Sequence, residues 1–273
     1  MTEYGNLEIL GVGAQRGGRF DRVLIAGSGK ITGDVECNCF ELPGAGKIEE
    51  GGLTVHGPLE IDGAGKVEGP VQAEGLEVNG SFKCESSCTV SGSAEVNGSL
   101  KAEGPCTIGG DAEICGSVKT EGDLTVSKLD ITGAVCVGGR LRATEIGIDG
   151  VLKVKGEVQA ESFRADGTVT IDGLLNAETV SLVVAGEDLI ESIGGGHVTV
   201  ERGRGGFFSF SRKRPHLFSN LIEADEIRLE YTDCRTVRGV NVHIGPECVI
   251  DRVEYSGSLT TDANCTVRER VKI

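Results

Sequence analysis

The sequence contains no tryptophan, one methionine and six prolines, and aromatic residues make up 4% of its 273 positions. This scarcity argues against an ordinary globular core, because large rings supply much of the buried area in such cores. No apolar run approaches the roughly 20 residues that span a bilayer, and the first ten residues lack the basic region of a secretory signal. We therefore expect a cytoplasmic protein whose ten cysteines are reduced.

Positive charge is also scarce, since 27 Lys and Arg face 42 Asp and Glu, for a formal net charge of −15. A nucleic-acid partner is disfavoured, because the summed negative field repels phosphates. Disorder is disfavoured as well, since Val, Leu and Ile recur at short intervals and charged residues are 25%. What the chain has in excess is glycine, with 43 residues, and these do not fall at every third position as they do in collagen.

Glycines instead recur at every sixth position, from Gly57 to Gly75 and again from Gly92 to Gly122. Between them lie pairs of apolar residues at positions i and i+2, such as Leu59 and Ile61. Each pair points to one side of a short strand. We expect the glycines to form the bends between strands, where a residue that tolerates positive φ is favoured.

A longer period of 17 or 18 residues joins three of these units. It relates Phe82, Leu100 and Val118, which are 18 apart, and Phe163 and Val180, which are 17 apart. The pattern predicts an all-β fold, a parallel β-solenoid with three short strands per coil and an apolar interior. A narrow interior also explains the shortage of aromatic residues.

The regularity of the repeat predicts four segments. Residues 1–20 are an N-terminal lead-in, residues 21–185 the main β-helix, residues 186–220 an irregular basic and aromatic insertion or cap, and residues 221–273 further coils. The last segment is indicated by Cys248 and Ile250, which recur 17 positions later as Cys265 and Val267.

Three stretches resemble the bactofilins, the polymer-forming cytoskeletal proteins of bacteria. Residues 59–75 read LEIDGAGKVEGPVQAEG and have the cadence of that family. The flanks VLIAGSGKITGDVEC at 23–37 and GPECVIDRVEY at 245–255 are similar to the longer bactofilin-like proteins of Gram-positive bacteria. The resemblance implies a right-handed β-helix and a scaffold that assembles end to end into filaments without nucleotide or other cofactor. Bactofilins are usually shorter and uninterrupted, so an adaptor that does not polymerise stays an alternative.

Stacking of terminal coils requires contact residues at both ends of the solenoid. By position, we expect the N-terminal contact near Val23, Leu24 and Ile25. The C-terminal contact is expected near Val267, Val271 and Ile273. The partner is then a second copy of the chain, with envelope or motility proteins as further candidates.

The predicted insertion concentrates cationic and aromatic residues. It offers either a loop that docks on an anionic membrane surface or a cap over the solenoid. The residues concerned are Arg202, Arg204, Phe207, Phe208, Phe210, Arg212, Lys213 and Arg214.

Signals for catalysis are few, and we assign no catalytic residue and no metal site. The stretch from Gly27 to Thr32 does not complete a phosphate-binding loop, because Ile31 follows Lys30. An alternative is a hexapeptide-repeat acyltransferase, a left-handed β-helix enzyme, in which His243 is the candidate catalytic residue. Six cysteines occupy inward positions of the repeat and are expected to act as small apolar residues; they are Cys37, Cys84, Cys88, Cys106, Cys248 and Cys265.

Overall fold

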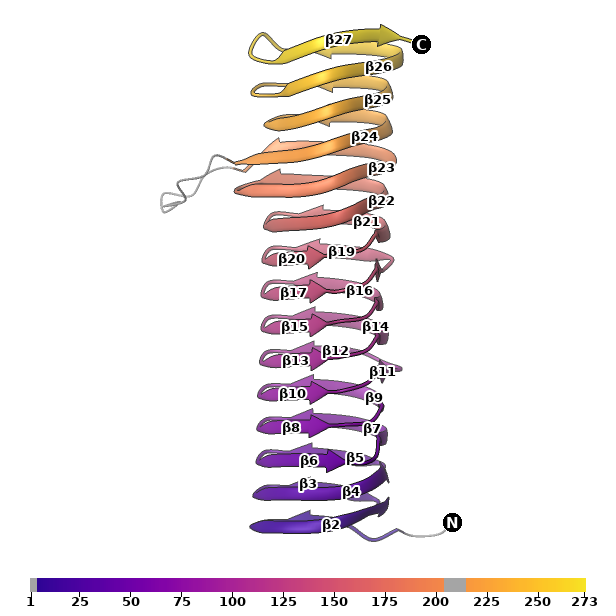
Figure 1. Ribbon diagram of the computed structural model, residues 1–273, viewed down its shortest axis with the longest axis vertical. Coiled ribbons are helices and arrows are strands. Elements are labelled where there is room, and N and C mark those ends of the chain that lie inside the picture. The colour runs from indigo at the N-terminus through magenta and orange to yellow at the C-terminus, as the bar shows by residue number, and fades with distance from the viewer. Residues whose placement is uncertain (1–3, 204–214) are drawn as a thin grey trace. The chain divides into compact units, whose positions relative to one another are not determined.

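The computed structural model describes residues 4–203 and 215–273, and all regular elements in these ranges are β-strands. No helix in the described ranges is therefore long and apolar enough to cross a membrane. The chain divides into two units, Met1–Gly139 and Arg140–Ile273. In each unit the strands are parallel and stacked in chain order, as Figure 1 shows. The predicted all-β solenoid is confirmed.

The first unit contains seventeen short strands. Their bounds are β1 Leu7–Ile9, β2 Val12–Arg19, β3 Arg22–Ile25, β4 Ser28–Cys37, β5 Cys39–Leu42, β6 Ala45–Glu49, β7 Leu53–Ile61, β8 Ala64–Val67, β9 Val71–Val78, β10 Ser81–Cys84, β11 Cys88–Val90, β12 Ala94–Val96, β13 Ser99–Ala102, β14 Cys106–Ile114, β15 Ser117–Thr120, β16 Leu124–Ile131 and β17 Ala134–Val137.

The second unit contains ten strands, of which β22 to β26 are longer because they continue around corners of the coil. Their bounds are β18 Leu141–Arg142, β19 Glu145–Ile148, β20 Val151–Val154, β21 Val158–Ala165, β22 Thr168–Val184, β23 Glu187–Arg202, β24 His216–Leu229, β25 Thr232–Ile244, β26 Val249–Thr261 and β27 Thr266–Lys272.

The strand register confirms the predicted ladders within each unit. Phe82 pairs with Leu100, and Leu100 pairs with Val118. In the second unit Phe163 pairs with Val180 in the same way. Equivalent apolar residues therefore lie directly above one another along the solenoid.

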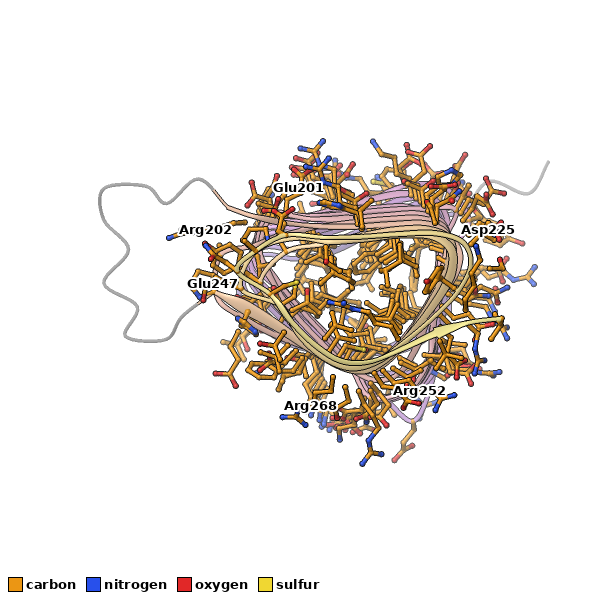
Figure 2. The ribbon with its side chains drawn as sticks, turned by 90° about the horizontal axis from the view of Figure 1, so that it is seen from above. Glu201, Arg202, Asp225, Glu247, Arg252 and Arg268 are labelled. Atoms are coloured by element: carbon orange, nitrogen blue, oxygen red, sulfur yellow. The ribbon has the colours of Figure 1, made fainter. Side chains whose placement is uncertain are left out.

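The interior of the coils is almost wholly apolar. Figure 2 shows three-sided coils filled with side chains, while labelled charged residues such as Arg252 and Arg268 point outward. Val, Ile, Leu, Ala and Cys make up most of the buried set, with a few phenylalanines such as Phe82 and Phe163. Among the described residues, the buried polar or charged side chains are Thr120, Asp188 and Thr232.

Glycines at one corner of the first unit allow backbone to approach backbone. A Cβ atom built on Gly63, Gly80 or Gly98 would overlap the carbonyl oxygen of the glycine one coil earlier. The expected reason for these glycines was wrong, because Gly33 is the single described glycine with a positive φ, at 98°. Close stacking of the corners, rather than left-handed backbone, excludes side chains here.

A ladder of ion pairs covers one face of the first unit. Lys47, Lys66 and Lys83 lie in register in successive coils. The Nζ of Lys83 lies 2.6 Å from a carboxylate oxygen of Glu85 and 2.9 Å from one of Glu103. Hydrogen bonds from Lys66 and Lys83 lower the pKa of Glu85 to about 2. This contribution to stability is therefore present at neutral pH and is lost as the carboxylate protonates in strong acid.

The lead-in expected over residues 1–20 is already part of the solenoid. β1 pairs with β3, placing Leu7 against Val23 and Ile9 against Ile25, and β2 pairs with β4. The sequence pattern failed here because Gln15 lies in register with the interior residue Ile31, where an apolar residue is usual.

The irregular segment expected over residues 186–220 is also much shorter than predicted. β23 pairs with β22 from Leu189 to Arg202, and β24 pairs with β23 from His216 onward. The glycines at 194–196 belong to β23, so they do not interrupt the coil. The pattern was obscured because outward positions in these coils carry apolar residues such as Leu189 and Phe218.

One buried carboxyl group departs from the apolar interior. Asp188 is 3% exposed, and its Oδ1 accepts a hydrogen bond of 2.8 Å from the backbone N–H of Val169. The bond lies near a shift in register between β22 and β23, where the offset changes from 19 residues at Ile171 to 18 at Leu174. Asp188 thus supplies an acceptor to a buried backbone N–H group. Burial nevertheless raises its pKa to about 6.

Candidate assembly ends

The first coil presents an unpaired strand edge. β1 and β2 pair with β3 and β4, and no described strand pairs with their opposite edge. Apolar side chains project beside this edge, with Leu10 69% and Val12 93% exposed. An edge with free N–H and C=O groups and apolar neighbours is suited to pairing with another strand.

The N-terminal contact expected at Val23, Leu24 and Ile25 is misplaced by one coil. These residues form β3, which pairs with β1 along one edge and with β5 along the other. Val23 and Ile25 have no exposed surface. Leu10 and Val12 replace them as candidates, and the pair Leu7 and Ile9, 16 residues before Val23 and Ile25, was the signal that could have located this coil.

At the C-terminal end, β27 pairs with β26, and no described strand pairs with its other edge. The expected contact residues all lie on this coil: Val267 and Val271 are half-buried, and Ile273 is 66% exposed. Arg270, however, lies in register with the fully buried Val253. A cation at an inward position blunts the edge of a sheet, so the two ends differ in chemistry.

The nominal nucleotide and acyltransferase signals occupy strand positions. Lys30 lies within β4 and forms an ion pair of 2.5 Å with Glu49. His243 lies in β25, where its Nδ1 is 2.8 Å from the hydroxyl of Thr260 and its Nε2 is 4.0 Å from Asp262. No group of three or more His, Cys, Asp or Glu residues in the described ranges is placed to hold a metal ion.

Most cysteines take the predicted interior positions. Cys37, Cys84, Cys88, Cys106 and Cys248 are buried, and so is Cys234. Burial raises the pKa of Cys37, Cys234 and Cys248 to about 12, so these thiols stay protonated and poorly reactive at neutral pH. Cys265 was expected to be inward but is partly exposed, because it lies on the last coil.

The basic and aromatic residues are described in part. The guanidinium group of Arg202 donates a hydrogen bond of 3.0 Å to the hydroxyl of Tyr231 and lies 5.0 Å from the centre of its ring. Figure 2 shows this side chain outside the coil. Arg204, Phe207, Phe208, Phe210, Arg212, Lys213 and Arg214 lie outside the described residues.

Comparisons with known proteins give two partial relatives. The chain is 39% identical over 84 residues to the uncharacterized protein YhbF of Bacillus subtilis (strain 168) and 42% identical over 91 residues to YhbE of the same strain. These matches cover 31% and 33% of this chain and 34% and 38% of the relatives. The chain thus spans about a third of the length of the curated relatives it matches. No family model and no solved structure matches.

Proposed function

We propose that this protein is a noncatalytic, bactofilin-like scaffold that assembles end to end through its terminal coils. The observation that carries this proposal is the unpaired edge of the first coil, flanked by the exposed Leu10 and Val12. A second copy is a suitable partner, because a strand edge of one coil can complete the hydrogen bonds of another. The assembly needs no nucleotide, and its site is cytoplasmic, with peripheral membrane docking and recruited envelope proteins as further proposals.

The second candidate function is an adaptor that does not form long polymers. Arg270 favours it, because a second copy stacked on the last coil would cover this cation at an inward position. Burying an unpaired charge is costly. Under this proposal the first coil still self-associates, and growth stops at small assemblies.

Charged substitutions at the exposed apolar residues test assembly at the first coil. We expect the double variant Leu10→Glu and Val12→Glu to shift the protein toward monomers, because the carboxylates would have to be desolvated on stacking. The measurement is sedimentation velocity with negative-stain electron microscopy at a fixed protein concentration. Val240→Glu is the matched control, since Val240 is 40% exposed but lies in β25, away from both terminal strands.

The pair Val267→Glu and Ile273→Glu tests the other end in the same assay. Filaments of the wild type that are shortened by either pair support end-to-end stacking. A monomeric wild-type protein, or filaments unchanged by both pairs, would contradict the proposed function.

A further inference from the structure

A hollow on the second unit combines apolar and acidic side chains. It extends over β22 to β25 and includes Leu189 and Phe218, which are paired in register and are 43% and 38% exposed. Large apolar residues at outward positions of two adjacent coils are unusual in this protein, whose outward ladders are mostly polar. They provide a surface that an apolar side chain can cover.

Three carboxylates border this apolar pair. Asp233 lies in register with Phe218, and Asp172 and Glu191 line the same hollow. Asp233 is 3.0 Å from His216, and Glu191 accepts a hydrogen bond of 2.9 Å from the amide of Asn220. In the described part of the chain, none of the three forms an ion pair with lysine or arginine.

The contrast with the first unit shows that this arrangement is particular to the hollow. There, Glu49, Glu85 and Glu103 each lie within hydrogen-bond distance of a lysine of the same face. At the hollow, the negative charges instead stay available to a cation from outside. An anionic lipid surface is a poor occupant, because its headgroups would meet these carboxylates.

We propose that this hollow binds a peptide segment that presents an aromatic side chain beside lysine or arginine residues. The aromatic ring would cover Leu189 and Phe218, and the cationic groups would pair with Asp172, Glu191 and Asp233. Apolar contact supplies burial and charge complementarity supplies orientation, as in other peptide-recognition sites. The inference does not depend on end-to-end assembly, since the hollow uses neither terminal coil.

The probe is a fluorescein-labelled peptide of the sequence RGGFFSFSRKR, which is that of residues 204–214 and has the required chemistry. Fluorescence anisotropy is measured with the full-length protein and with a full-length variant in which Phe207, Phe208 and Phe210 are changed to Ser. Binding to both proteins identifies a site open to a partner. Binding to the variant alone identifies a site that the chain's own segment fills. Both results support the hollow, and absence of binding to both proteins overturns it.

Substitutions then locate the binding in the variant with the three serines. We expect Leu189→Ser, and separately the pair Asp172→Asn and Glu191→Gln, to weaken binding at least tenfold, and added salt to weaken it as well. The carboxylate pair keeps the test decisive if Leu189→Ser disturbs folding. Leu174→Ser is the matched control, since Leu174 is 39% exposed but lies outside this hollow. Equal binding by all variants, or by a peptide with serine at its three phenylalanines, overturns the proposal.

Discussion

Replacing Gly98 with alanine should destabilise the first unit by about 4 kcal/mol or more, which is a large effect for one methyl group. The added Cβ would overlap the carbonyl oxygen of Gly80 in the preceding coil. Neither partner can rotate away, because both groups belong to the backbone of stacked corners. The coils must separate locally, which stretches the hydrogen bonds between them. Thermal and urea unfolding followed by circular dichroism measure the loss.

Gly75→Ala is the matched control for this substitution. Gly75 has the same chemical identity and lies in β9 of the same unit, but a Cβ there would meet nothing within 4 Å. We expect no loss of stability, and a gain of up to about 1 kcal/mol because alanine restricts the unfolded chain. Equal effects of the two alanines would refute the account of glycine as a residue for close approach.

Asp188→Asn should raise the free energy of unfolding at pH 8 by up to about 3 kcal/mol. The pKa of the buried carboxyl group is about 6 against an ordinary value of 3.8, and each pKa unit corresponds to about 1.4 kcal/mol. Asparagine keeps an oxygen that can accept the hydrogen bond from the N–H of Val169. It removes the charge that is costly to bury.

The same shift predicts a pH dependence with a defined sign. Because the pKa of Asp188 is raised in the folded state, its contribution favours folding below about pH 4 and is lost as the pH rises through 6. The difference in stability between wild type and Asp188→Asn should therefore be small at pH 4 and largest above pH 7. Asp149→Asn, at an exposed position, is the control and should show no such trend. A difference independent of pH would show that Asp188 is not the group responsible.

The sequence could predict the ladders because the solenoid repeats one local rule in every coil. Phe82 and Leu100 are in contact for the same reason that they are 18 residues apart, so periodicity translates directly into register. The interior cysteines followed from the same alternation. The predicted role of glycine failed, because spacing shows where a bend lies but not whether its backbone is left-handed or simply crowded.

The ends and the corners were harder to predict because the rule is relaxed there. Gln15 occupies an inward position of the first coil, where one neighbouring coil is enough to define the strand. At the last coil, Val267, Arg270 and Cys265 follow the inward register but are only partly covered. The hollow was missed for another reason: Leu189 and Phe218 are far apart in sequence and come together only through the pairing of β23 with β24.

The corner between Arg202 and His216 has a practical consequence for labelling. β23 and β24 keep their parallel pairing from His197 to Val200 and again from Glu187 to Leu189, although the chain between these strands is longer than at other corners. A solenoid corner can thus absorb additional length without loss of register. A fluorescent protein or an affinity tag genetically fused within this corner should leave the stacked coils intact, which would allow the protein to be followed in living cells with both termini unmodified.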